Sequence, residues 1–161
     1  MTMMNIVVSV VIAGILALWG TIAWTGAHPT SAFDSKDALA QEIVAASRLA
    51  EQTGTGATIE FVAGPDGTGN ATLYSGRPFA AAPYTSQNQP FNLEAPVTSN
   101  GNTSFAILIA KNGSAGIVSP FTHGATVATQ PTCSGTETLV VGFAAHTTPL
   151  NFDCEEARVN E

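Results

Sequence analysis

The chain has 161 residues, with 5 Lys and Arg against 12 Asp and Glu and a formal net charge of −7. This length fits one domain of modest size, and the acidic balance, without any cluster of basic residues, argues against a nucleic-acid groove. Only 11% of the residues are charged, so the polarity comes mainly from neutral side chains, which suits exposure outside the cell and packing between subunits.

Residues 3–24 form an uncharged and mostly apolar segment. As a helix it would span about 33 Å, enough to cross the hydrocarbon core of a membrane. A cleavable signal peptide starts with basic residues, whereas the first basic residue of this chain is Lys36. A single-pass anchor stays open as an alternative, because hydrophobicity alone does not separate a permanent span from a helix that later leaves the membrane.

The stretch MTMMNIVVSVVIAGILA at the start of the chain resembles the mature N-terminus of type IV pilins and pseudopilins. It has a first methionine, then Thr2, two large apolar residues, a polar fifth residue and an aliphatic run through Gly14 to Ala17. In that family, prepilin peptidase removes a short charged leader just before the residue numbered 1 here. The resemblance therefore implies that Met1 is a processed and N-methylated end, and that Thr2, Asn5 and Gly14 act in assembly.

Asn5 departs from the family pattern, which nearly always has glutamate at this position to pair with the N-terminal amine of a neighbouring subunit. An amide accepts a hydrogen bond but does not neutralise that positive charge. Two explanations stay open. The chain is a minor or tip subunit without such a neighbour, or it belongs to a divergent filament in which Asn5, Thr2 or backbone carbonyls meet the amine.

The helical pattern is expected to break around Gly26–Pro29, since proline donates no backbone N–H. This break separates an apolar helix over residues 1–28 from a head domain over 29–161. A second, amphipathic helix is predicted over 34–53, with Asp34 or Ser35 as its N-cap. Its apolar positions recur at helical spacing and are Leu39, Ile43, Ala46 and Ala50.

The rest of the chain predicts antiparallel β structure, with one hairpin from 58–62 and 71–74 and another from 105–110 and 116–119. A further strand is predicted over 138–144. Residues 76–101 are rich in Pro, Asn, Gln and Ser and predict an exposed connection. The expected fold is therefore α+β. A long N-terminal helix packs on one antiparallel sheet of roughly four to five strands within residues 57–154, as in type IV pilins; a separate helix of an unrelated α+β domain is the alternative.

The two cysteines, Cys133 and Cys154, predict one disulfide, because an even count is typical of an exported domain. Such a bridge would close a loop over 133–154 and add about 3 kcal/mol of stability. Two unpaired buried thiols are the alternative. Type IV pilins similarly enclose a C-terminal loop between two cysteines.

No motif indicates catalysis, a cofactor or a metal. The histidines are dispersed and lack the spacing of metal ligands, and the acidic residues around Cys154 are typical of a solvated surface. Three Asn-X-Ser/Thr sequons leave glycosylation open, because such triplets are frequent by chance in this composition; they start at Asn70, Asn102 and Asn112.

The resemblance implies a non-enzymatic structural subunit, a major pilin, that polymerises with itself into a type IV pilus-like filament. Its partners would be prepilin peptidase and the inner-membrane assembly platform, with the inner membrane as its location before assembly and the outside of the cell afterwards. Such filaments serve adhesion, motility, DNA transfer or phage reception, so a host surface or a phage is the implied external partner. The alternatives are a minor pseudopilin of a type II secretion system and a monomeric membrane-anchored binding module.

Overall fold

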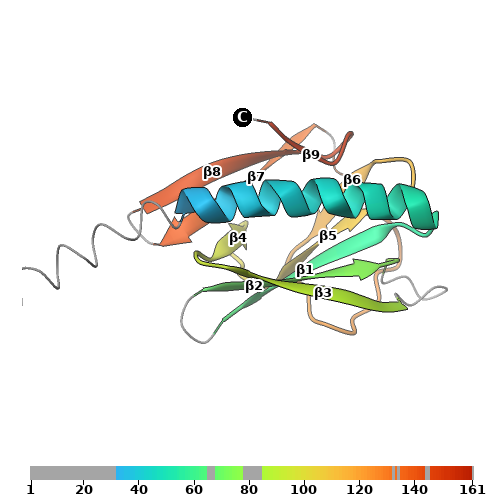
Figure 1. Cartoon of the computed structure of the whole chain (residues 1–161), viewed down its shortest axis with the longest axis horizontal. Helices are drawn as coiled ribbons and strands as arrows, with labels where there is room; N and C mark the ends of the chain where they lie inside the picture. The colour runs from blue at the N-terminus through green and yellow to red at the C-terminus, as the bar shows by residue number, and fades with distance from the viewer. Residues whose placement is uncertain are drawn as a thin grey trace, which may run out of the picture.

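The structure is a computed structural model that describes residues 32–64, 68–77, 85–131, 133, 135–143 and 146–160, with the backbone alone for 85–89. The expected apolar helix over 1–28 and the expected break around Gly26–Pro29 lie outside these residues. The described part is α+β, with one helix and nine strands. Figure 1 shows the helix lying lengthwise across the strands.

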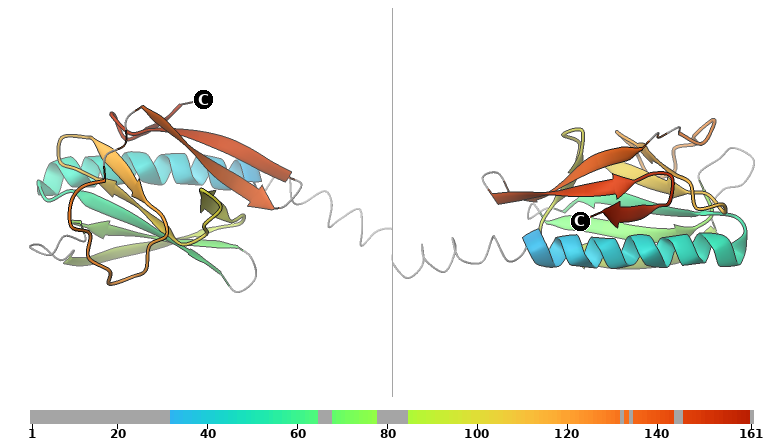
Figure 2. Two further views of the ribbon diagram at one scale, coloured as in Figure 1. Left: turned by 180° about the vertical axis from the view of Figure 1, so that it is seen from behind. Right: turned by 90° about the horizontal axis from the view of Figure 1, so that it is seen from above.

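The helix covers residues 32–53 and packs on the sheets with one face. The predicted apolar residues of this helix are all 0% exposed, and they are Leu39, Ile43, Ala46 and Ala50. Burial of one leucine or isoleucine side chain contributes about 1.5–3 kcal/mol. The predicted amphipathic helix is therefore confirmed over 34–53, and the view from above in Figure 2 shows both sheets on the same side of it.

The predicted N-cap at Asp34 or Ser35 is wrong, because the helix already includes residues 32–35. Ser35 is 2% exposed, and its hydroxyl accepts a hydrogen bond of 2.9 Å from the backbone N–H of Ala95. The hydroxyl therefore satisfies a backbone group of the connection after β3 (Thr85–Leu93) instead of capping its own helix.

Both predicted hairpins are confirmed, and they provide four strands of a five-stranded antiparallel sheet. The central strand β1 pairs with β2 on one side and with β5 on the other. In spatial order the strands are β3 (Thr85–Leu93), β2 (Gly69–Ser75), β1 (Ala57–Ala63), β5 (Phe105–Ile109) and β6 (Ala115–Val118).

A second antiparallel sheet has four strands and contains the predicted late strand. In spatial order these are β4 (Val97–Ser99), β7 (Thr136–Phe143), β8 (His146–Asp153) and β9 (Arg158–Asn160). The prediction of a single sheet ending at residue 154 is therefore wrong. Val97 of β4 pairs with Val141 of β7 across a long stretch of sequence, and a short strand that pairs at such a distance leaves little local signal.

The prediction of an exposed connection over residues 76–101 is also wrong. This stretch contributes β3 and β4, and Leu93, Ala95 and Val97 are at most 3% exposed. These side chains alternate with less buried neighbours, which is the strand period of two. The prolines and amides around them masked this alternation, since Pro and Asn are depleted in most strands.

One hydrophobic core joins the helix to both sheets. Ile43 of the helix belongs to the same buried cluster as Ile59 of β1 and Phe152 of β8. A smaller cluster, with Ala106, Leu108 and Phe121, lies on the other face of the five-stranded sheet. This outer face is crossed by residues 119–131, which we call the crossing segment.

Candidate functional site

The N-terminal site residues predicted from the sequence, Met1, Thr2, Asn5 and Gly14, lie outside the described residues, so their proposed roles in processing and assembly stay predictions. Within the described part, three regions have the geometry for a function. They are the outward face of the helix, the hairpin closed by the cysteines, and the outer face of the five-stranded sheet.

The outward face of the helix carries two exposed apolar side chains. Phe33 is 58% exposed and Val44 is 43% exposed. Eleven residues separate them, which is close to three helical turns, so they lie on one line along the helix. The helix therefore packs one side on the sheets, while Phe33 and Val44 are exposed apolar side chains among exposed polar ones such as Arg48.

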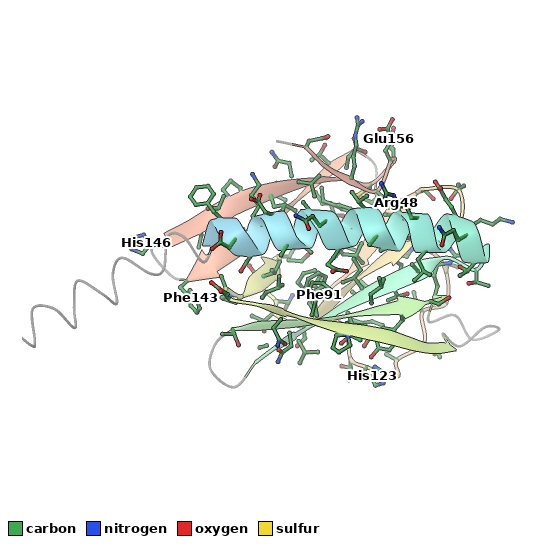
Figure 3. The ribbon with its side chains drawn as sticks, viewed as in Figure 1. Arg48, Phe91, His123, Phe143, His146 and Glu156 are labelled. Atoms are coloured by element: carbon green, nitrogen blue, oxygen red, sulfur yellow. A yellow bond between two sulfur atoms is a disulfide. The ribbon has the colours of Figure 1, made fainter. Side chains whose placement is uncertain are left out.

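This helix directly follows the apolar N-terminal segment in the sequence. The helix begins at the end of the head where β7 ends and β8 starts, which Figure 3 marks with Phe143 and His146. No described helix has both the length and the apolar character to cross a membrane; the uncharged residues 3–24 lie outside the described part of the chain.

The predicted disulfide between Cys133 and Cys154 is present, with a Cα–Cα distance of 5.7 Å. It joins the two chain ends of the β7–β8 hairpin, in which Thr136 pairs with Asp153. Next to the bridge, the backbone N–H of Cys154 donates to the carbonyl of Gly135 at 3.0 Å. The bridge thus closes the open end of this hairpin.

The C-terminal turn is attached to the rest of the head around this bridge. The Ala115 N–H of β6 donates to the Cys154 carbonyl at 2.7 Å, and the Ser47 hydroxyl of the helix donates to the Ala157 carbonyl at 3.2 Å. The hairpin end is thereby joined to both the five-stranded sheet and the helix.

Glu137 brings a carboxylate within 4.8 Å of both cysteine sulfurs. Two thiolates and a carboxylate would suit a zinc ion, but sulfurs that are bonded to each other offer no thiolate. The geometry therefore favours a structural bridge at this place.

Asp153 organises the turn after β8. Its Oδ1 accepts the backbone N–H of Glu155 at 3.0 Å and that of Glu156 at 3.4 Å. The Glu155 N–H is the main cause that lowers the pKa of Asp153, and Asn160, Glu156 and Arg158 lower it further. This carboxylate is committed to local hydrogen bonds, which is consistent with the predicted surface role of the acidic residues near Cys154.

The sequence patterns did not predict a polar cluster that lies on the outer face of the five-stranded sheet. Glu60 of β1 is 4% exposed, and its Oε2 lies 2.8 Å from Nδ1 of His123 in the crossing segment. The His123 ring centroid lies 5.8 Å from that of Tyr74 on β2. Figure 3 shows His123 on the side of this sheet away from the helix.

The environment of this cluster raises the pKa of Tyr74. Burial is the larger cause and the negative charge of Glu60 is the second, while a hydrogen bond with Thr72 acts in the opposite direction. Glu60 pairs with Thr72 of β2 and with Ala106 of β5 in the sheet register. A carboxylate in the middle of a sheet needs a polar partner such as His123, because an unpaired buried charge is costly.

Further contacts hold the crossing segment on the sheet. Gln130 donates from Nε2 to the Leu108 carbonyl at 3.0 Å and accepts from Nη1 of Arg77 at 2.7 Å. Burial lowers the pKa of the Arg77 guanidinium. Together with the contact between His123 and Glu60, these bonds attach the crossing segment to β1, to β5 and to the residues after β2. The geometry therefore indicates a structural role.

A signal for this cluster exists in the sequence only in part. Glu60 alternates with the apolar Ile59 and Phe61, which places it on the opposite face of the strand. Nothing in the spacing indicates that His123 contacts Glu60 from so far along the chain.

No family model, no curated protein and no solved structure matches this chain.

Proposed function

We propose that the chain is the structural subunit of a type IV pilus-like filament, in which the N-terminal segments of many copies bundle and the heads cover the outside. The observation that carries this proposal is the pair of exposed apolar side chains on the helix over residues 32–53. One side of this helix packs fully on the sheets, the other exposes Phe33 and Val44, and the helix follows the uncharged residues 3–24.

This arrangement supports assembly by a physical argument. Residues 3–24 carry no charge and offer a long apolar surface, and burial of such surface between copies stabilises a polymer by about 25 cal/mol per Å². Phe33 and Val44 would add exposed apolar surface on the helix that comes after this segment in the sequence. A disulfide-closed head suits the oxidising space outside the cytosol.

Replacement of Val44 by Asp tests the proposal. A charge on the outward helix face should prevent filament formation, because it would be buried without a partner between copies. The isolated head should keep its melting temperature within a few degrees, since exposed positions tolerate substitution. The measurement is the amount of chain in fibres sheared from the cells that make it, together with electron microscopy of those fibres.

Val62→Asp is the matched control, because Val62 is 50% exposed on β1, away from the helix. We expect this variant to assemble. Normal fibres with Val44→Asp would contradict the filament proposal. A chain that stays monomeric and occurs in no fibre would identify a membrane-anchored binding module, and a scarce periplasmic chain would identify a minor pseudopilin.

A further inference from the structure

The structure distinguishes the three Asn-X-Ser/Thr sequons of the chain. A sugar is attached to the amide nitrogen Nδ2 of asparagine within this triplet. The triplet must be accessible, and the hydroxyl two residues later must be able to reach the asparagine side chain.

The sequon at Asn70 lies within β2 and is held extended. Asn70 pairs with Val62 of β1 and with Asn92 of β3, so the strand is bonded on both sides. Along an extended strand, side chains two residues apart stand about 6.6 Å from each other. The Thr72 hydroxyl is therefore too far from the Asn70 amide, although Asn70 itself is exposed.

The sequon at Asn102 is engaged through its reactive atom. Nδ2 of Asn102 donates a hydrogen bond of 3.1 Å to the Ser119 hydroxyl. The backbone of Asn102 also exchanges two hydrogen bonds with Ser99, at 3.0 and 2.9 Å. Asn102 is only half-exposed, so attachment of a sugar would require these contacts to break.

The sequon at Asn112 forms the exposed turn between β5 and β6. The Ser114 hydroxyl donates to Oδ1 of Asn112 at 2.9 Å, and the Ser114 backbone N–H approaches the same oxygen at 3.4 Å. Both of these hydrogen bonds go to the amide oxygen of Asn112, and neither of them involves the amide nitrogen. The hydroxyl and the amide are thus already in the bent arrangement that the other sequons lack.

The turn also has free space and a rigid support. Gly113 has a φ of 85°, and a Cβ at this position would meet no heavy atom within 4 Å. The Gly113 N–H donates to the Ala110 carbonyl at 3.0 Å, and the Ala110 N–H donates to the Ser114 carbonyl at 2.7 Å. The hairpin therefore presents Asn112 on a fixed base with room for a bulky group.

The position of the turn in the head is compatible with such a group. Figure 1 shows the β5–β6 connection at the end of the molecule where the helix ends, away from the first described helix residue. The disulfide indicates that the head is in an oxidising compartment. Lipid-linked sugar diphosphates are used on that side of the membrane.

We propose that Asn112 is the acceptor of an N-linked glycan donated by a polyprenyl-diphosphate sugar. Nδ2 of Asn112 forms a bond to the anomeric carbon of the sugar while the bond from that carbon to the diphosphate oxygen breaks. The diphosphate leaves with the electron pair of that bond, and the proton that Nδ2 loses passes to the departing diphosphate. No oxidant or reductant takes part.

Mass spectrometry of the full chain, isolated from the cells that make it, tests this proposal. Trypsin cuts after Lys111 and next after Arg158, but not between Arg77 and Pro78, so the fragment 112–158 is separated from 49–111, which holds the other two sequons. We expect the sugar mass on the fragment 112–158. Electron-transfer fragmentation then places it on a residue.

Variants complete the test. Asn112→Gln and Ser114→Ala should remove the whole sugar mass, whereas Ser114→Thr, Asn70→Gln and Asn102→Gln should retain it. A chain without sugar, a sugar on the fragment 49–111, or a sugar that persists in Asn112→Gln would overturn the proposal; the last result would identify an O-linked sugar. Because the readout is the mass of the chain, it does not depend on filament formation.

Discussion

Glu60 links β1 to the crossing segment, although the two are distant in the sequence. Its carboxylate is buried on the outer face of the central strand, and His123 of the crossing segment contacts it at 2.8 Å. The charge also acts on Tyr74, whose pKa lies above its ordinary value of 10.0 because of burial first and Glu60 second. The neutral phenol is therefore the form that the fold favours.

Replacement of Glu60 by Gln should lower the pKa of Tyr74 part of the way toward its ordinary value. The shift should be partial, because burial is the larger cause and remains. Ultraviolet absorbance of the phenolate measures it in a Tyr84→Phe background, which leaves Tyr74 as the sole tyrosine. Glu94→Gln, at an exposed site, is the control, and an unchanged Tyr74 pKa in Glu60→Gln would contradict the assigned cause.

The raised pKa of Tyr74 determines how the contribution of this residue to stability depends on pH. Since the folded state holds the Tyr74 proton more tightly, this group contributes stability at pH values below the unfolded pKa of about 10. That contribution is lost as the pH rises from about 10 through the folded pKa. As the pH rises above about 10, denaturant midpoints should fall faster for the wild type than for Tyr74→Phe.

At the scale of elements, the helix over residues 32–53 serves two surfaces. Its inner face meets both sheets at Leu39, Ile43, Ala46 and Ala50, which are all 0% exposed. Its outer face exposes Phe33 and Val44. A surface helix usually has one apolar stripe, and Phe33 and Val44 are apolar side chains that lie outside that stripe.

Leu39→Ala and Val44→Ala should separate the two faces. We expect Leu39→Ala to lower the free energy of unfolding by about 2–5 kcal/mol, because it leaves a cavity in the core. Val44→Ala should change it by less than about 0.5 kcal/mol, since the position is open in the isolated chain. Equal losses in urea denaturation of the full chain in detergent would show that Val44 also packs within the head.

The β7–β8 hairpin depends on a covalent bond at its open end. Replacement of both Cys133 and Cys154 by Ser should lower the free energy of unfolding by about 3 kcal/mol, because the unfolded chain gains freedom. Chemical denaturation with and without reductant measures this loss. Reductant should destabilise the wild type by a similar amount and leave the double variant unchanged; a reductant effect on the double variant would assign the loss to another cause.

The whole molecule combines local elements that the sequence predicts with pairings that it does not. The helix and both hairpins were predictable because their partners are close in sequence and follow simple periods. The second sheet was not, because β4 pairs with β7 across residues 97–141. The buried residues of 93–97 were hidden among prolines and amides, which usually indicate loops.

For the candidate sites the division is similar. The cysteine pairing followed from count alone, since the chain has only 2 cysteines. The cluster of Glu60, His123 and Tyr74 was not predictable, because His123 contacts Glu60 from 63 residues further along the chain. The choice of Asn112 among three identical sequence patterns likewise required the hydrogen bonds of each asparagine.

The sequence by itself determined the apolar N-terminal segment, the buried stripe of the helix and the two hairpins, because each arises from contacts or periodicities within a few residues. Only the tertiary structure decided that one helix covers two sheets and that the crossing segment closes the outer face. Those features depend on contacts between residues far apart in the chain. Burial and hydrogen bonding of the complete fold select such contacts, and no local pattern encodes them.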